Sequence, residues 1–485
     1  MPKPRFRETM KATLVSLIPT EQAQQAGRPA LTPELLAASG ARYSRNNEGL
    51  DAILARIDPE NMDRSVDAIF RMVDYGHQSI ADMAPVAIFL DDISIWLACH
   101  IWTLCPTAGG QESSTRYIEI NADALPDPAG LGIPPQQIDI WHKNMQAAFA
   151  AYQQALQLWT HIGEAHPEYT AIPRHLRLAT DEKSQKTVAR MLRNYRFDRA
   201  RYFLPAAAKT NMMMVMSARG WVQLCQYLLS HPLPEPHHLG TLIQAELALA
   251  SPRLLKHAQR QEGIATGIWE EFLGLARQAV SEGMPANLAG DASSPEAAPT
   301  ATLEISVPPD VSQADITAAL THHHNRYGWT GSALKRTGVR YRWNAMALGE
   351  IRDLNRHRTG NRHMPLLPVG FYGALDQLPA GTTSDIQQTI AAIRALQDVG
   401  RQITAEARAA IAREEPASVY SALLGTQFPF ERCTTADKFI YEAELRTGIG
   451  AHYRYARHYR DTLALWYQRF PATRGRILEG SAEPE

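Results

Sequence analysis

The stretch Asn355–Asn361 reads Asn-Arg-His-Arg-Thr-Gly-Asn and places two guanidinium groups and one imidazole on three consecutive residues. Arginine carries a planar, permanently charged fork that matches the oxygens of phosphates and carboxylates. Two such forks beside a histidine suit an anionic, delocalised ligand such as a nucleotide phosphate. The alternative is a solvated basic helix end, which is what an arbitrary triplet of this kind usually is.

A second stretch, far upstream, changes that balance. Gly110–Tyr117 reads Gly-Gln-Glu-Ser-Ser-Thr-Arg-Tyr and offers a carboxylate, hydroxyls and another guanidinium within eight residues. The two stretches look like separated halves of one binding motif.

The composition is that of an ordinary globular protein. The chain has 485 residues, a formal net charge of -1, 45% hydrophobic and 20% charged residues, and this length suggests two to four domains. A near-neutral charge gives no overall attraction to nucleic acid or membrane. The four cysteines show neither a Cys-x-x-Cys pair nor zinc spacing, which indicates reduced thiols. With no evident signal peptide and no apolar run long enough to span a bilayer, we expect a cytoplasmic protein without a membrane partner.

The hydrophobic pattern predicts long helices and few strands. Prolines and prolonged loss of periodicity mark the turns, above all at 231–238 and at a linker over 281–300. The four methionines between 212 and 216 are interpreted as part of a helix that lines the core or a pocket. We expect strands at 11–19, 86–90 and 301–308, and helices at 93–104, 144–163, 183–194, 212–229 and 240–280.

After the predicted linker the opening pattern of the chain returns. Residues 301–308 echo 12–19, and Tyr-Gly at 327–328 echoes Tyr-Gly at 75–76. At the same offset of 252 residues, the helix expected at 93–104 falls on 345–356. The sequence therefore predicts a diverged internal duplication, with a first module at 1–280 and a shortened second module at 301–485.

The order Gly-His-x-Ser, short strand, apolar helix, Glu-x-Ser-x-Arg-Tyr over residues 76–117 resembles the flavin-dependent thymidylate synthases, the ThyX family. That family's hallmark reads Arg-His-Arg-x-x-Ser, followed a few residues later by Ser-x-Arg-Tyr. Arg201–Pro205 and Ser217–Arg219 resemble its Arg-x-x-Leu-Pro and Asn-x-Arg segments. The resemblance covers most of 11–248 and, more weakly, 301–470. It implies an α+β fold in which each module has a small mixed or antiparallel sheet with long helices, so that one chain forms a pseudo-dimer.

Each module keeps the half of the motif that the other has lost. The first has Leu-Cys-Pro at 104–106 in the Arg-His-Arg position, and the second has Leu-Leu-Pro-Val at 366–369 in the Ser-x-Arg-Tyr position. The family's later Leu-Arg pair matches Leu228 in the first module and Arg446 in the second. Complementary retention indicates one shared site. Because the family's sites are implied to lie between subunits of a homotetramer, we expect a homodimer of this chain to imitate that tetramer.

The resemblance implies conversion of dUMP to dTMP, with FAD as cofactor, and NADPH and methylenetetrahydrofolate as co-substrates. No cysteine nucleophile and no metal is needed. Arg446 would polarise the uracil ring as the catalytic residue. The expected substrate-binding residues are Glu112, Ser114, Arg116 and Arg201, and the expected cofactor-binding residues are His77, Ser79, Ser217, Arg219, Arg356, His357 and Arg358.

Several of these residues have simpler interpretations. His77 could be a structural histidine, and Arg116 could belong to a surface ion pair. Arg446 could pair with Glu442 and Glu444 on its own helix. The run His322–His324 is interpreted as solvated, since three consecutive histidines point around a helix and cannot all bind one ion.

Three functions compete. The first is the uracil-nucleotide methyltransferase, acting on dUMP or on another uracil nucleotide. The second is a ThyX-like protein that binds flavin or nucleotide without synthase activity, favoured by loss of the motif serine at Gly109 and Asn361. The third is a nucleic-acid binder using the basic segment 335–362, which the neutral overall charge makes the weakest.

Overall fold

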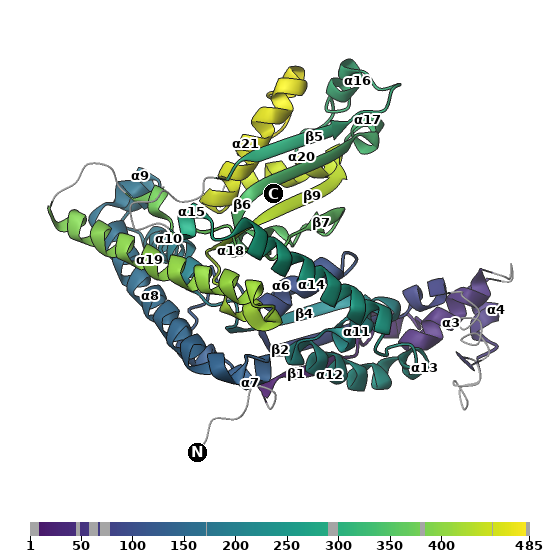
Figure 1. Cartoon of the computed structure of the whole chain (residues 1–485). Helices are drawn as coiled ribbons and strands as arrows, with labels where there is room; N and C mark the ends of the chain where they lie inside the picture. The colour runs from purple at the N-terminus through teal and green to yellow at the C-terminus, as the bar shows by residue number, and fades with distance from the viewer. Residues whose placement is uncertain are drawn as a thin grey trace. The chain divides into compact units, whose positions relative to one another are not determined.

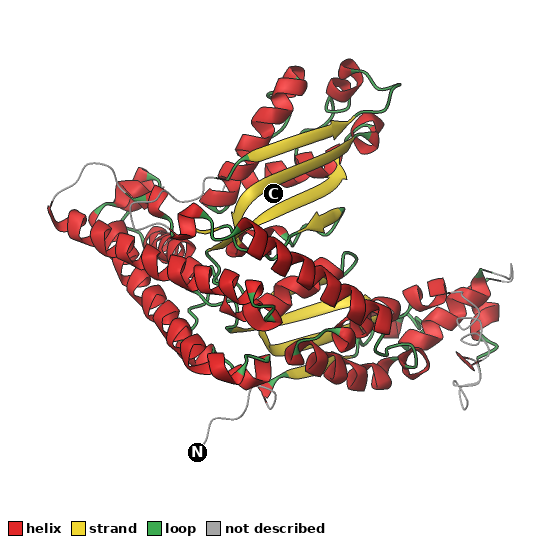
Figure 2. Cartoon of the chain, in the orientation of Figure 1, coloured by secondary structure: helices red, strands yellow, loops and turns green. Residues whose placement is uncertain are grey.

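The computed structural model describes residues 9–44, 49–57, 66–67, 78–170, 172–289, 299–378, 384–448 and 450–481. The chain forms two compact units that mix helices with antiparallel sheets (Figures 1 and 2). Unit 1 contains Met1–Ser113, Asp123–Ile138 and Ala208–Leu273, and unit 2 contains Ser114–Ala122, Asp139–Ala207 and Gly274–Glu485. This division differs from the predicted modules, and residues 290–298 of the predicted linker lie outside the described residues. The module boundaries therefore stay a prediction.

Unit 1 is built on a four-stranded antiparallel sheet with the order β1-β2-β4-β3. Strand β2 has a bulge between Leu90 and Ile93 and runs directly into helix α6, whose first turn is capped by the Ser94 hydroxyl. Strand β4 runs directly into helix α11. The bounds are β1 Lys11–Val15, β2 Pro85–Ser94, β3 Gly109–Glu112, β4 Lys209–Ser217, α6 Ile95–Leu104 and α11 Ala218–Ser230.

Unit 2 contains a second antiparallel sheet with the order β5-β6-β9-β7, and β8 also pairs with β9. Strand β6 has a bulge between Trp343 and Met346 and runs into helix α18, while β9 runs into helix α20. The bounds are β5 Ala301–Ser306, β6 Gly338–Ala347, β7 Asn361–His363, β8 Gly370–Phe371, β9 Thr426–Thr435, α18 Leu348–Leu354 and α20 Ala436–Thr447.

The two sheets agree in strand order, in the bulge and in the two helices that leave them. The bulge begins at Leu90 in one sheet and at Trp343 in the other. Gly109 pairs with Val215 in one sheet, and Asn361 pairs with Cys433 in the other. Each of these pairs lies at the same number of residues from the bulge of its own sheet. The offset of 252 residues predicted from the sequence therefore relates Gly109 to Asn361. For the elements before them, β2 and α6 in one unit and β6 and α18 in the other, the structural offset is one residue longer than this prediction.

Helix α12 packs on β1 and β2 in unit 1, and helices α20 and α21 pack on β5, β6 and β9 in unit 2. Among the described residues, none of the helices is both long and apolar enough to cross a membrane. Their bounds are α2 Glu21–Gln25, α3 Pro33–Tyr43, α4 Leu50–Leu54, α7 Pro128–Leu131, α8 Ile138–Ala165, α9 Arg174–Leu178, α10 Glu182–Ala200, α12 Pro234–Ala250, α13 Pro252–Leu255, α14 Glu262–Glu282, α15 Ala286–Ala289, α16 Gln313–Ala318, α17 Ser332–Arg336, α19 Ser384–Ala412 and α21 Tyr453–Arg469.

Three secondary-structure predictions were wrong. The continuous helix expected at 240–280 is broken at Ser251 and again over 256–261, between α12, α13 and α14. The methionine run belongs to strand β4 rather than to a helix, and Met212, Met214 and Met216 are buried in alternation, as on one face of a strand. The predicted turn at 231–238 is shorter, because Pro234 and Pro236 lie in the first turn of α12, where proline's missing N–H is harmless. The strands at the start of each sheet and the helix ending at Leu104 are confirmed.

The loop that joins α18 to β7 carries the Arg-His-Arg triplet and depends on Gly360. This glycine has φ +82°, and a Cβ built on it would collide with the carbonyl oxygen of Cys433.

Gly475 has a similar φ of +79° but open space around it. We predict that Gly475→Ala lowers the free energy of unfolding by about 1–2 kcal/mol, the ordinary cost of a left-handed alanine. Gly360→Ala should lower the free energy of unfolding clearly more than Gly475→Ala does, because the added Cβ also collides with the chain. If urea unfolding gives equal losses for the two variants, this description of the packing is contradicted.

Candidate functional site

Unit 2 contains a cavity of about 690 Å³ at the Arg-His-Arg loop. It lies between that loop, the segment 323–330, helix α20 and the start of α21. Its lining includes five cationic side chains, two carboxylates and three tyrosines: Arg326, Arg356, Arg358, Lys438, Arg446, Asp437, Glu442, Tyr327, Tyr441 and Tyr455. Cations outnumber acids, and aromatic faces lie among them, so the cavity suits an anionic ligand with an aromatic part.

A buried ion pair fixes the loop that carries the triplet. Arg432 on β9 donates to the carbonyl oxygens of His357 (2.7 Å) and Thr359 (2.6 Å). The same guanidinium pairs with Glu442 at 2.5 Å, and both side chains are almost fully buried. Tyr341 donates a further hydrogen bond of 2.6 Å to Glu442. Since Glu442 is already engaged by Arg432, it does little to offset the positive charge of the cavity.

Arg446, the predicted catalytic residue, is held on three sides. Its Nε donates to Nε2 of His357 at 2.7 Å, and its Nη2 donates to the carbonyl oxygen of Asp353 at 2.9 Å. Its guanidinium lies 5.2 Å from the ring centre of Tyr455. Glu444 bonds instead to His323, so the interpretation of Arg446 as the partner of Glu442 and Glu444 is wrong.

Burial and charge act together on the triplet. Burial, with the nearby guanidinium groups of Arg446, Arg432 and Arg362, holds the pKa of His357 well below its usual value. The imidazole is therefore neutral near pH 7 and can accept the hydrogen bond from Arg446. Burial and the neighbouring Arg356 also lower the pKa of Arg358. A bound anion would relieve this crowding of positive charge.

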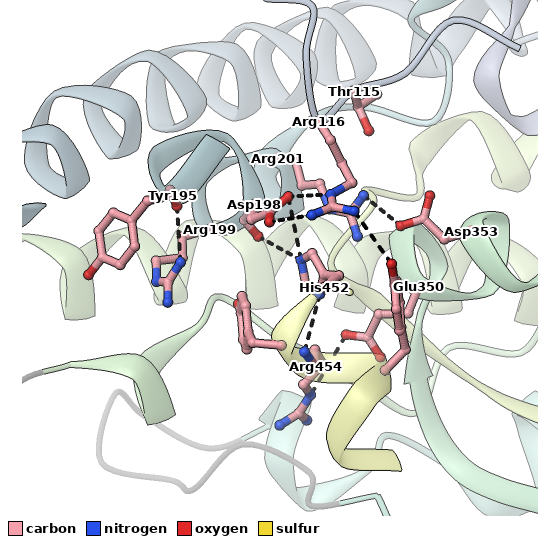
Figure 3. Close-up of polar contacts among 12 residues, drawn as sticks. Thr115, Arg116, Tyr195, Asp198, Arg199, Arg201, Glu350, Asp353, His452 and Arg454 are labelled. Atoms are coloured by element: carbon pink, nitrogen blue, oxygen red, sulfur yellow. Dashed lines mark hydrogen bonds and ion pairs between the residues drawn. The ribbon is translucent and has the colours of Figure 1, made fainter. Parts of the chain in front are cut away.

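Arg116 and Arg201, two predicted substrate ligands, lie in a buried cluster of charges within the same unit (Figure 3). Arg116 forms a bidentate pair with Asp198, with bonds of 2.7 and 2.9 Å. Arg201 is fully buried and donates to Asp353 at 2.9 Å. Burial would raise the pKa of Asp353, but the guanidinium groups of Arg201 and Arg116 outweigh it and hold that pKa below its usual value.

The charge cluster and the cavity meet at two residues. Asp353 bonds to Arg201 through its carboxylate and to Arg446 through its carbonyl oxygen. Tyr455, which lines the cavity, accepts a hydrogen bond of 3.4 Å from Nη1 of Arg116. Neither Arg116 nor Arg201 is among the residues that line the cavity. Within unit 2 the two halves of the motif are therefore connected, with Arg116 and Arg201 one layer behind the cavity wall.

The other predicted site residues have local partners. Ser114 accepts a hydrogen bond from the Arg116 backbone in unit 2, and Glu112 accepts one from Trp102 in unit 1. In unit 1, Ser217 caps α11 and Arg219 pairs with Asp82, while Ser79 is exposed in a short 3₁₀ helix. His77 lies outside the described residues. The ligand-binding roles of these residues stay predictions.

Sequence reasoning missed Arg326 and Lys438 in the cavity wall and misjudged His323. Lys438, Tyr441 and Leu445 follow helical spacing and lie on the face of α20 that also presents Arg446, so that spacing was an available signal. His323 is buried against Glu444, whereas its neighbours His322 and His324 are exposed, so the interpretation of the whole run as solvated was wrong. Across the described ranges, no group of three or more His, Cys, Asp or Glu side chains could hold a metal ion.

A protein-family model and a curated protein each match part of the chain. The family described as thymidylate synthase complementing protein matches residues 30–252. The UPF0159 protein Ta1429 of Thermoplasma acidophilum is 24% identical over 241 residues, which are 46% of this chain and 48% of that protein. The chain thus spans about half the length of this curated relative.

Two solved structures are also similar. Both are of the UMP/dUMP methylase PolB from Streptomyces cacaoi, bound with 5-Br dUMP or with 5-Br UMP. They are 16% and 14% identical to this chain, with TM-scores of 0.31 and 0.30. Each match covers 51% of this chain and 93% or 92% of the other.

The resemblance to the thymidylate synthase complementing family is confirmed over residues 30–252. That range contains the Glu-x-Ser-x-Arg-Tyr motif and the segment Arg201–Pro205. It ends before the Arg-His-Arg triplet and before Arg446. The second half of the chain lies outside this match, so its resemblance to the family stays a prediction.

The Arg116–Asp198 pair allows a test of the buried cluster. Removing one partner of a buried ion pair leaves an uncompensated charge and typically costs about 3–5 kcal/mol, while replacing both partners by apolar residues costs much less. We predict that Asp198→Leu and Arg116→Met each destabilise the chain more than the double variant does, as measured by urea unfolding. A double variant whose loss equals the sum of the single losses would show that the pair is not coupled.

The His323–Glu444 contact predicts a pH dependence. The hydrogen bond that His323 donates to the Glu444 carboxylate raises the pKa of His323 above its usual value. The contribution of this contact to the free energy of unfolding is therefore fully present below about pH 6.5. It is lost as the pH rises through the raised pKa of His323. We expect the difference in unfolding free energy between the wild type and His323→Gln to shrink between pH 6 and pH 9. The exposed neighbour serves as control, since His324→Gln should show no such trend.

Proposed function

We propose that the protein methylates C5 of the uracil ring of a nucleotide, converting dUMP to dTMP with FAD as cofactor and NADPH and methylenetetrahydrofolate as co-substrates. The observation that carries this proposal is the cationic cavity of unit 2, formed by the Arg-His-Arg triplet and Arg446. The family match over residues 30–252 supports it, because that range supplies Arg116 and Arg201 to the same unit.

The cavity residues fit a dinucleotide such as FAD. Arg356, Arg358 and Lys438 provide guanidinium and ammonium donors for a diphosphate, and Tyr441 offers an aromatic face. When bound, FAD would supply the redox chemistry of the reaction and the relay of the one-carbon unit. The protein's part would be to hold the anionic groups and exclude water.

Arg446 would act on the uracil ring. Its fixed guanidinium would stabilise negative charge on the ring and so make C5 more nucleophilic. A donor already aimed at the developing charge needs no reorganisation, and losing one such donor typically costs about 100–1000-fold in rate. Arg116 and Arg201 would keep Asp198 and Asp353 in place behind the cavity, and a nucleotide phosphate would compete with these carboxylates for the same guanidinium groups.

The likeness of the two sheets supports a duplicated origin with one shared set of ligands. Leu228 and Arg446 are each the eleventh residue of the helix that follows the matching strand, α11 in unit 1 and α20 in unit 2. A catalytic arginine thus stands in one unit where the other has leucine. We propose that Glu112, Ser79, Ser217 and Arg219 of unit 1 complete the site, together with His77, in a homodimer.

A second candidate function is flavin or nucleotide binding without synthase activity. Gly109 and Asn361 stand where the family motif has serine, and both candidate phosphate ligands, Arg116 and Arg201, are already paired with carboxylates. Methylation of a different uracil nucleotide is a variant of the first proposal. Nucleic-acid binding has the least support, given a net charge of -1.

The test combines flavin content with product formation. Purified protein should show flavin absorbance and form dTMP from dUMP, and it should allow a thymidine auxotroph to grow. Arg358→Ala should weaken flavin binding about 10–100-fold, the effect of one charge-assisted hydrogen bond. Arg446→Ala should keep flavin and lose about 100–1000-fold in rate.

The matched control is Arg336→Ala, because Arg336 is exposed, lies outside the cavity wall and pairs only with Asp310 among the contacts of unit 2 described here. It should change neither flavin content nor rate. Bound flavin without dTMP formation would favour the second function. Protein that binds neither flavin nor dUMP would overturn both.

A further inference from the structure

His357 makes a contact that a cofactor ligand would not be expected to make. Its ring is buried, and its Nε2 accepts the hydrogen bond from Nε of Arg446 at 2.7 Å. A guanidinium has only donors, so Nε2 must carry the lone pair and the proton of the neutral ring must be on Nδ1. The ring of Tyr441 stands edge-on to the imidazole with 6.3 Å between their centres. One ring nitrogen is thus committed to Arg446 before any ligand arrives.

The contacts of Arg446 divide its guanidinium into held and available parts. Nε is held by His357, and Nη2 is held by the carbonyl oxygen of Asp353. The ring of Tyr455 limits movement on one face. Among the hydrogen bonds of the described residues, Nη1 has none, and Arg446 lines the cavity. One terminal nitrogen of the group is therefore left for a ligand in an orientation that its neighbours determine.

We propose that His357 is a positioning residue that works through Arg446 and does not itself bind the cofactor. This inference deepens the proposed function, on which it rests for the nature of the reaction, and it replaces the role that the motif implies for His357. The imidazole acts as a neutral acceptor that holds Arg446 in the orientation needed to meet the uracil ring. Second-layer contacts of this kind decide whether a catalytic group is held closely enough to the productive geometry.

The surroundings of His357 support a neutral acceptor. The charged groups that lower its pKa are Arg446 on α20, Arg432 on β9 and Arg362 on β7. Of the two carboxylates in the same cavity wall, Asp437 and Glu442, the latter is paired with Arg432. Arg432 also binds the carbonyl oxygen of His357, which fixes the backbone beneath the ring. A protonated imidazole here would lose its bond to Arg446 and add a like charge. The arrangement therefore excludes His357 from acting as a proton donor near neutral pH.

A double-mutant cycle separates positioning from direct binding. A misplacement of a catalytic group by about 1 Å can lower the rate on the order of 100-fold. We therefore expect His357→Leu to lower kcat for dTMP formation by up to about 100-fold. The KM for dUMP and the affinity for flavin should stay near the wild-type values. Combining His357→Leu with Arg446→Ala should be no slower than Arg446→Ala alone. His357→Gln, whose amide oxygen can accept the same bond, should restore much of kcat.

Losses that multiply in the double variant, or a loss of flavin affinity in His357→Leu, would show direct ligand binding and overturn the inference. If the wild type binds ligand but makes no dTMP, the proposed function fails and the inference is decided by nuclear magnetic resonance. In protein labelled with ¹⁵N at histidine, the signal lost in His357→Gln identifies this ring. It should show the Nδ1–H tautomer, and in Arg446→Ala its Nε2 shift should change and its pKa should rise.

His458 provides the control, because its Nε2 bonds to Glu350 and not to Arg446. Its signal should be the same in the wild type and in Arg446→Ala. An Nε2–H tautomer at His357, or a His357 signal that Arg446→Ala leaves unchanged, would overturn the inference whatever the activity of the protein.

Discussion

The site of unit 2 depends on the buried pair of Arg432 and Glu442. A buried guanidinium with unmet donors is costly, and Arg432 meets this requirement with one carboxylate and two backbone carbonyls. Those two carbonyls belong to His357 and Thr359, so the charge that the fold must satisfy also fixes the loop that carries the triplet. The backbone on both sides of Arg358 is held by this one interaction.

The cost of this arrangement is a concentration of positive charge. Burial and like charges lower the pKa values of His357 and Arg358, which means that the folded chain disfavours the charged forms of both groups. Such strain in a cavity wall is typical of a binding site, because an incoming anion recovers part of the energy. The paired carboxylates behind the wall, Asp198 and Asp353, keep Arg116 and Arg201 from adding to it.

The sequence predicted the elements with a clear pattern. Short β-rich runs predicted strands at 11–19 and 301–308, which form over 11–15 and 301–306, and a proline stop predicted the end of the helix at Leu104. The methionine run misled because methionine favours helices in isolation, while pairing with β2 and β3 decided its structure. The motif halves predicted one site shared by Arg116 and the triplet; the structure links Arg116 to the cavity only through Tyr455, so the shared site stays a prediction. The partners of Arg446 were unpredictable from local spacing, because His357 lies 89 residues away.

We propose that the cationic cavity at the triplet holds FAD and the uracil nucleotide together, with the uracil ring at Arg446. Crystals grown with 5-bromo-dUMP would test it most directly, since the anomalous signal of bromine locates the uracil ring without ambiguity. The account predicts a bromine peak inside the cavity lined by Arg356, Arg358 and Arg446, which Arg446→Ala weakens. A peak elsewhere on the chain, with the cavity holding solvent alone, would contradict it.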